Sequence, residues 1–286
     1  MDTGFVVVVL LIAVIGGGIW WWSHVRSRRI EAAMEVFLSR NPGWQRDTSL
    51  CGVTAGQLAD RTPATPRGDR RFGIEHAATG PLEITVAGAP VPCTASCGQW
   101  WYEIRSTTTD SKGQTTTTYN RQNLPVVAVE LPAPVPADIS ITPESVFGRI
   151  GLTRGGDQLE SDAFNRRFRV EGGDRTLTVQ LLDARLQQHL LEGYTQRRMA
   201  LSGRLLVCSG DPQEQDRSLY GPIRDLPGLQ RDATDLLSIL PPQFWRAIGV
   251  DTTAGGGPSS PPPAAAPPAP PAPPAPPMPP PVPPVA

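Results

Sequence analysis

Four cysteines are the residues of this 286-residue sequence whose type and spacing could do chemistry: Cys51, Cys93, Cys97 and Cys208. Four thiolates could bind zinc, but structural zinc sites usually use two short C-x2-C pairs. Here Cys93 and Cys97 form one close pair at a longer spacing, and the other two stand alone. A zinc site, a Cys93–Cys97 disulfide and unlinked thiols all remain open, and the pattern favours unlinked thiols. Cys208 lies in an apolar stretch that is typical of a core.

The three histidines, His24, His76 and His189, are scattered along the chain. No Ser-His-Asp or Cys-His arrangement can therefore be named, and the sequence has neither a G-x-G-x-x-G motif nor a P-loop. We predict no catalytic residue, no metal ligand and no cofactor, and the sequence identifies no small-molecule substrate. Whether the protein is an enzyme stays open, and the absence of a catalytic motif argues against it.

The stretch ESDAFNRRFRV, residues 160–170, has a basic and aromatic character that could suggest an RNA-binding strand. The RNP1 pattern needs a glycine between its basic and aromatic residues, which is missing here. A net charge of −1 also gives no general attraction to nucleic acid. We interpret the stretch as a core strand with Phe164, Phe168 and Val170 on the buried face. A helix would also align the two phenylalanines, so the periodicity does not decide.

The stretch Phe5–Trp22 contains 18 residues and no charge. As a helix it would extend about 27 Å, close to the roughly 30 Å thickness of a bilayer core. Three tryptophans end the run, which is typical of a membrane interface, and an arginine cluster that includes Arg28 and Arg29 follows. No Lys or Arg precedes it, in contrast to a cleavable signal peptide. We predict an uncleaved transmembrane helix with the N-terminus outside and the arginines in the cytoplasm.

These patterns divide the chain into five parts. We predict a short external N-terminus (1–4), a transmembrane helix (5–22), a juxtamembrane helix (23–43), a soluble α+β domain (44–250) and a disordered Pro/Ala-rich tail (251–286). In the juxtamembrane helix, Ile30, Ala33, Met34, Phe37 and Leu38 share one face. The tail has no charged residue after Asp251. It should sample polyproline II, as a spacer or as a ligand for an aromatic groove of a protein partner.

The soluble domain should be a mixed antiparallel sheet with short helices. The stretch up to about Gly80 is polar and predicts a loop with one short helix, and from Pro81 the period changes to two, which indicates strands. QWWYEIRS and TTTTY predict a β-hairpin around Asp110–Gly113. Asp174 and Asp183 are suitable N-caps for two helices. The further expected elements are strands within 124–132, 137–145 and 202–210 and an amphipathic helix over 225–240.

Between about residues 65 and 245 the sequence resembles a group of uncharacterised, membrane-anchored actinobacterial proteins with a domain of unknown function similar to DUF3137. The residues that carry the resemblance are RGDRR (67–71), QWWYEI (99–104), VVAVELPAPVPADISITPES (126–145) and ESDAFNRRFRV (160–170). The sequence departs from the group at CTASCGQW, which inserts Cys93 and Cys97. The resemblance implies an α+β cytoplasmic module on a membrane tether, and it implies no catalytic residue.

Three functional hypotheses follow. The first is a membrane-tethered interaction or scaffold module without catalytic activity, held in the lipid by Phe5–Trp22. The second is a redox or metal-dependent membrane-bound enzyme that uses Cys93 and Cys97. The third is an extracytoplasmic cell-envelope protein, which applies if the orientation is reversed. We expect a single-pass protein of the cell membrane with its main domain in the cytoplasm and with no nucleic-acid partner.

Overall fold

The computed structural model describes residues 3–86, 88–144, 157, 159–210 and 226–250. Within these residues the helices are α1 (Thr3–Arg40), α2 (Ala55–Arg61), α4 (Asp162–Asn165), α5 (Arg175–Leu181), α6 (Ala184–Gly193), α8 (Leu226–Ile239) and α9 (Pro242–Ala247). The strands are β1 (Gln45–Asp47), β2 (Phe72–Val86), β3 (Ala89–Thr109), β4 (Thr115–Glu130), β5 (Ile139–Pro143), β6 (Phe168–Gly172), β7 (Arg198–Ser202) and β8 (Leu205–Ser209).

The eight strands form one antiparallel sheet in the order β1-β2-β3-β4-β8-β7-β5-β6. The long strands β2, β3 and β4 are consecutive hairpins, whereas β4 pairs with β8, which is far away in the sequence. The prediction of an α+β fold with an antiparallel sheet and short helices is therefore confirmed. β1 and β7 were not predicted, and β1, with three residues, is too short to show an alternation.

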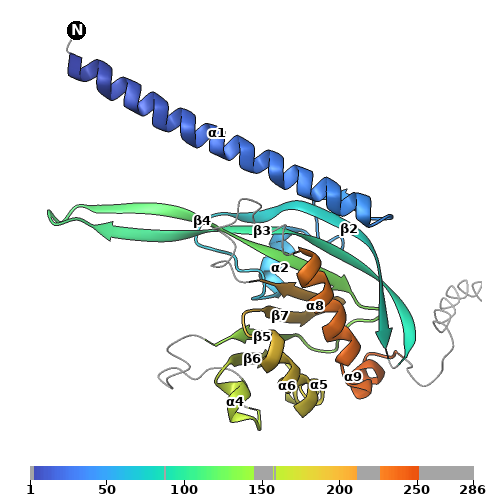
Figure 1. The fold of residues 1–286 in the computed structure, drawn as a ribbon. Helices are drawn as coiled ribbons and strands as arrows, with labels where there is room; N and C mark the ends of the chain where they lie inside the picture. The colour runs from blue at the N-terminus through green and yellow to red at the C-terminus, as the bar shows by residue number, and fades with distance from the viewer. Residues whose placement is uncertain (1–2, 87, 145–156, 158, 211–225, 251–286) are drawn as a thin grey trace, which may run out of the picture.

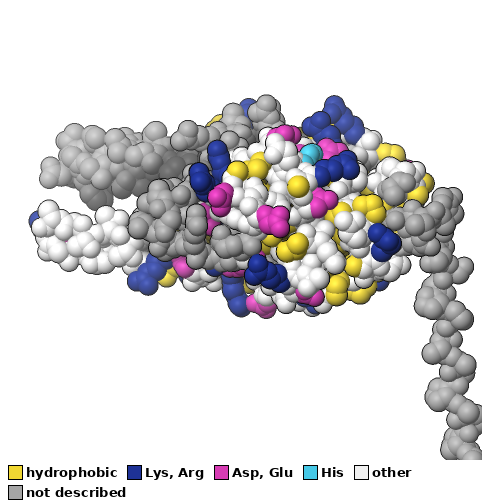
Figure 2. Space-filling model, turned by 90° about the horizontal axis from the view of Figure 1, so that it is seen from below, with side chains coloured by type: hydrophobic (Ala, Val, Ile, Leu, Met, Phe, Trp, Pro, Cys, Tyr) yellow, Lys and Arg dark blue, Asp and Glu magenta, His cyan; other side chains and the backbone are white. Residues whose placement is uncertain are grey.

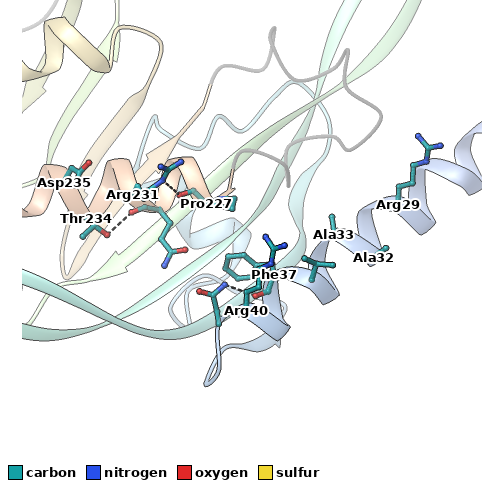
Figure 3. Close-up of a pocket in the computed structure, with 12 residues that line it drawn as sticks. Arg29, Ala32, Ala33, Phe37, Arg40, Pro227, Arg231, Thr234 and Asp235 are labelled. Carbon is teal, nitrogen blue, oxygen red and sulfur yellow. Dashed lines mark hydrogen bonds between the residues drawn. The ribbon is translucent and has the colours of Figure 1, made fainter.

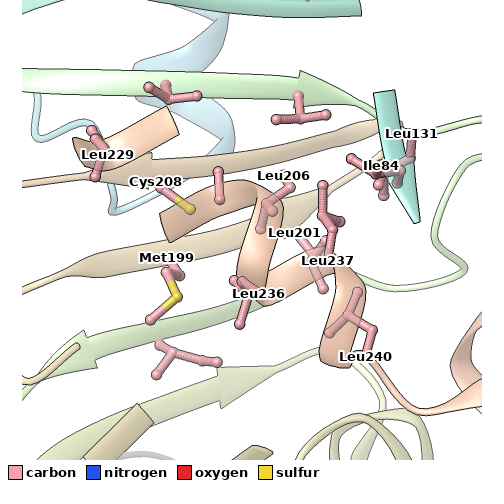
Figure 4. Close-up of a cluster of buried hydrophobic side chains, with 14 of the residues drawn as sticks. Ile84, Leu131, Met199, Leu201, Leu206, Cys208, Leu229, Leu236, Leu237 and Leu240 are labelled. Carbon is pink, nitrogen blue, oxygen red and sulfur yellow. The ribbon is translucent and has the colours of Figure 1, made fainter. Parts of the chain in front are cut away.

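The two faces of the sheet support two hydrophobic cores. The larger core lies between the sheet and the C-terminal half of α1 together with α5, α6, α8 and α9 (Figure 1). In it, Leu236 and Leu237 of α8 lie close to Leu201, Leu206 and Cys208 of the sheet (Figure 4). The smaller core lies on the opposite face, where α2 covers Trp100 and its neighbours. Because successive side chains of a strand point to opposite faces of the sheet, neighbouring residues contribute to different cores.

The predicted helix caps are confirmed. The Asp174 carboxylate accepts hydrogen bonds from the backbone N–H groups of Thr176 and Leu177 at the start of α5. Asp183 accepts one from the Leu186 N–H at the start of α6. In α8 the predicted inward face is buried, including Leu229, Ala233, Leu236 and Leu237.

Two predictions of local structure were wrong. The stretch before Gly80 is not only a loop and a short helix, because β2 already begins at Phe72 and pairs with β3. ESDAFNRRFRV is not a single strand: α4, capped by Ser161, carries Phe164, and β6 begins only at Phe168. The Ser161 side chain accepts a hydrogen bond from the Phe164 N–H, and this local cap favours the helical turn over a strand. The prediction that both phenylalanines are buried is confirmed.

The ends of β3 and β4 continue beyond the sheet as a two-stranded arm (Figure 1). The arm pairs Thr107 with Thr117 and Thr109 with Thr115, and the turn at Asp110–Gly113 closes it as predicted. Gly113 has φ +78°, which favours glycine. Figure 2 shows few charged or hydrophobic side chains on the arm, whereas both signs of charge are interspersed on the body.

The backbone of α1 is helical from Thr3 to Arg40. In the part of the chain that the structure describes, no helix has a stretch long and apolar enough to cross a membrane. Most side chains of the predicted span, including those of residues 5–15, lie outside that part. The predicted tail, residues 251–286, also lies outside it.

Candidate functional site: a groove between α1 and α8

The C-terminal half of α1 packs on the sheet through one face and leaves another open. Ile30, Met34 and Phe37 are buried against the larger core, and their spacing of four and three residues puts them on one side of the helix. Ala32, Val36 and Arg40 follow the same periodicity on a different side and remain exposed. The open face of α1 forms one wall of the groove, and nearly half of the Val36 surface is accessible.

Charged side chains also connect α1 to the sheet. Arg46 of β1 donates hydrogen bonds to Glu31 at 2.8 Å and to Glu35 at 2.6 Å. His76 Nδ1 lies 3.1 Å from Glu31 Oε1. The hydrogen bond from Arg46 is the main cause that lowers the pKa of Glu31, and the one to Glu35 raises the pKa of Arg46. All of these groups are partly exposed, so each pair contributes little stability but limits how α1 lies on the sheet.

The position of His76 depends on a bulge in β2 between Glu75 and Ala78. His76 has φ +49°, a conformation that is uncommon for a residue with a side chain. Gly98 lies opposite, where an added Cβ would approach Ala77 to 3.1 Å. The bulge thus leaves little room for a side chain at Gly98 of β3, and it directs His76 toward Glu31 of α1.

A tryptophan supports the end of this wall. Trp44 lies four residues after the end of α1 and contacts Phe37 edge to face, with ring centroids 5.3 Å apart. The indole lies against Gly80 of β2 so closely that a Cβ at Gly80 would overlap the ring. Gly80 therefore determines where Trp44 can lie, and Trp44 in turn fixes Phe37, which contributes to the groove.

The second wall is α8. Its buried face, which includes Leu229 and Leu237, packs on the same side of the sheet as α1, mainly over β2 and β4. The opposite face presents Pro227, Arg231 and Thr234 to the groove (Figure 3). Arg231 Nε donates to the Pro227 carbonyl at 3.3 Å, and Thr234 donates to the Gln230 carbonyl at 2.9 Å. Two helices side by side on one sheet face thus leave a groove between them.

The groove has a volume of about 800 Å³ and is open to solvent. This volume is within the usual range of ligand pockets, roughly 300–1,000 Å³. It is lined by Arg29, Ala32, Ala33, Val36, Phe37, Arg40, Asn41, Pro227, Gln230, Arg231, Thr234 and Asp235. The lining is mainly apolar on the α1 wall, and among the described residues that line it there are three arginines and one aspartate. Such a surface suits a ligand with an apolar part and an anionic part.

The structure does not bring Cys93 and Cys97 together. Cys93 and Cys97 lie four residues apart in the regularly paired part of β3, so about 13 Å separates their Cα atoms. A disulfide needs Cα atoms within about 7 Å, and all four cysteines are free thiols. In the described residues no group of three or more His, Cys, Asp or Glu could hold a metal ion.

The environments of the thiols make them poor nucleophiles. Burial raises the pKa of Cys97 and of Cys208 to about 12 and that of Cys93 to about 11. Burial also raises the pKa of Cys51, whose backbone N–H donates to the Ser96 hydroxyl at 2.7 Å. Because the thiolate is the reactive form, these thiols resemble core residues rather than catalytic ones.

The histidines lie on three different elements. His24 is on α1, His76 is on β2, and His189 of α6 packs against Tyr194 with ring centroids 5.0 Å apart. No signal in the sequence points to the groove, since nothing in it shows that α8 lies beside α1. The exposed apolar pair Ala32 and Val36, opposite the buried face of α1, is the one feature that could have suggested an unfilled surface.

Comparison with known proteins gives little further information. No protein-family model matches the sequence, and no curated protein does. Among solved structures, the chain is similar to the crystal structure of the mycobacterial trehalose monomycolate transport factor A, TtfA, with a TM-score of 0.40 and 10% sequence identity. The match covers 76% of this chain and 96% of that chain. A TM-score of this size supports no inference about function, and the resemblance to DUF3137-like proteins stays a prediction.

Proposed function

We propose that this protein is a membrane-tethered binding module without catalytic activity, which holds an amphiphilic ligand in the groove between α1 and α8. The observation that carries the proposal is the groove itself, an open and largely apolar surface of about 800 Å³ on α1 and α8. An exposed apolar concavity rimmed by polar residues is typical of a binding site. The separated, high-pKa thiols favour binding over redox chemistry with Cys93 and Cys97.

The tether in this proposal is the uncharged run Phe5–Trp22. It is continuous along the chain with the helix wall of the groove, because α1 extends from Thr3 to Arg40. If Trp22 lies at the interface, Arg29 is about 10 Å beyond it along the helix axis. The groove would then begin close to the lipid headgroups. The arginines that follow the run favour a cytoplasmic body, and the Pro-rich tail would be a spacer or a ligand for a protein partner.

Three measurements test the proposal. For the tether, the chain should stay in the membrane fraction after a high-salt wash, and deletion of Phe5–Trp22 should release it. A reporter fused to the C-terminus should show cytoplasmic activity, and exported activity would reverse the orientation and support an extracytoplasmic protein.

For the groove, a photoactivatable analogue of the uncharged lipid monolauroylglycerol should label residues 29–41 of α1 and 227–235 of α8 in nanodiscs. Ala32→Trp fills the groove and should abolish this labelling. Ser39→Trp is the matched control, because Ser39 is exposed on α1 and does not line the groove. Labelling that is the same in both variants would disprove binding in the groove.

A further inference from the structure

The charges of the groove are not evenly distributed along it. Arg40 lies next to Phe37 on the α1 wall and Arg231 lies above Pro227 on the α8 wall, whereas Arg29 is at the other end of the α1 wall (Figure 3). Arg29 and Arg40 are eleven residues apart, so about 16 Å of helix axis separates them. Ala32, Ala33 and Val36 lie between them and form an apolar track.

We propose that the groove selects a single-chain phospholipid with a phosphate monoester headgroup. Arg40 and Arg231 bind the phosphate from the two walls, and the acyl chain lies along Ala32, Ala33 and Val36 toward Arg29. This inference rests on the proposed function and names the ligand class for the same site.

The charge of the site matches this headgroup. Arg40 and Arg231 place two positive charges at the proposed position of the headgroup, and a phosphate monoester carries about −1.5 to −2 near pH 7. Arginine is the side chain best suited to phosphate, because its planar guanidinium donates two parallel hydrogen bonds. Arg40 and Arg231 are both exposed and can move to meet one headgroup. Asp235, the one acidic residue among the described residues of the lining, lies one turn further along α8 than Arg231.

The length of the apolar track and its orientation relative to the membrane also agree with this ligand. One leaflet contributes about half of the roughly 30 Å hydrocarbon core, so an acyl chain spans about 15 Å. This is close to the separation of Arg29 and Arg40 along α1. With Phe5–Trp22 in the membrane, Arg29 is the membrane-near end of the track and Arg40 the far end. A lipid that moves out of the cytoplasmic leaflet with its headgroup first would enter the groove in this orientation without turning over.

The experiment compares two lipids that differ only in the phosphate. Lauroyl lysophosphatidic acid and monolauroylglycerol, each with a photoactivatable group at the chain end, are added separately to nanodiscs that carry the full-length protein. Labelled peptides are then quantified by mass spectrometry. The phosphate lipid should label residues 29–37 about tenfold more than the uncharged lipid, which corresponds to about 1.4 kcal/mol. In the double variant Arg40→Gln/Arg231→Gln, the two lipids should label these residues equally.

The control variant Arg175→Gln/Arg246→Gln removes the same charge from exposed positions outside the groove and should keep the tenfold preference. Labelling by monolauroylglycerol also reports whether each variant is folded. If both lipids label the groove of the unmodified protein equally, phosphate selection is refuted and the proposed function stands. If neither lipid labels it, the proposed function fails as well. A preference that survives Arg40→Gln/Arg231→Gln would refute the assigned roles of these arginines.

Discussion

Phe164 and Phe168 stack on each other with ring centroids 4.9 Å apart and planes inclined by 28°, although one lies in a helical turn and the other begins a strand. Both rings are buried in the larger core. The stack thus links α4 to the sheet edge at β6, and the intervening Arg166 and Arg167 are exposed. A basic and aromatic sequence motif here serves packing.

Phe168→Ala should lower the free energy of unfolding by about 3–5 kcal/mol, because it removes a buried ring and leaves a cavity. Urea denaturation of the full chain in detergent measures the change. Val179→Ala is the control, since Val179 on α5 is about half exposed and should cost much less. Equal effects of the two substitutions would contradict the core role of Phe168.

Gly80→Ala should displace Trp44 and cost about 1–3 kcal/mol, because the added methyl group overlaps the indole ring. Since Trp44 contacts Phe37, lipid labelling in the groove should also fall. In Gly56→Ala the new Cβ has no neighbour within 4 Å and the site is helical, so stability should stay equal or rise. A Gly80→Ala protein as stable as Gly56→Ala would disprove the contact.

The stability contributed by Glu31 should depend on pH. Its pKa in the folded protein is lowered, mainly by the hydrogen bond from Arg46, so its contribution is present above the ordinary glutamate pKa and is lost as pH falls through the folded value. Glu31→Gln should therefore cost up to about 1 kcal/mol at pH 7, as expected for a partly exposed pair. At a pH low enough to protonate Glu31 in the folded protein, the two proteins should have the same denaturation midpoint. If the denaturation midpoints still differ at that pH, the effect of Glu31→Gln does not come from the charge of Glu31.

The thiols should react slowly in the folded protein. Because burial raises the pKa of Cys93 to about 11 and that of Cys97 to about 12, little thiolate exists near neutral pH, and the amount rises as pH increases toward these values. A colorimetric thiol reagent should thus react much faster with the urea-unfolded chain than with the native one at pH 7.5. Rapid, stoichiometric reaction of native Cys93 or Cys97 would return the redox enzyme hypothesis to consideration.

The sequence predicted elements whose signals are local. Asp174 and Asp183 cap their helices through neighbouring N–H groups, and Asp110–Gly113 closes a turn by itself. The start of β2 at Phe72 was not predicted, because the alternation that begins with Phe72 and Ile74 is interrupted by the bulge between Glu75 and Ala78. Phe164 was placed in a strand, since two phenylalanines four residues apart align in either structure and the Ser161 cap was not recognised.

The candidate site could not be predicted, because it depends on contacts between segments that are distant in the sequence. Its walls are residues 29–41 and 227–235, and no local pattern shows that two segments nearly 200 residues apart will lie side by side. The sequence did predict the buried faces of both helices, including Met34 and Leu237. The groove is lined mainly by the exposed face of each helix. In most surface helices this face only contacts water.

The position of α8 in the chain has a consequence for synthesis. The strands β2, β3 and β4 are complete when residue 130 has left the ribosome, but α8, which covers them, is made about 100 residues later. Until then the apolar face of this meander, including Val127 and Val129, has no cover from the C-terminal part. A nascent chain whose translation stops before residue 226 would expose this face and should require chaperones, and it would lack the second wall of the groove.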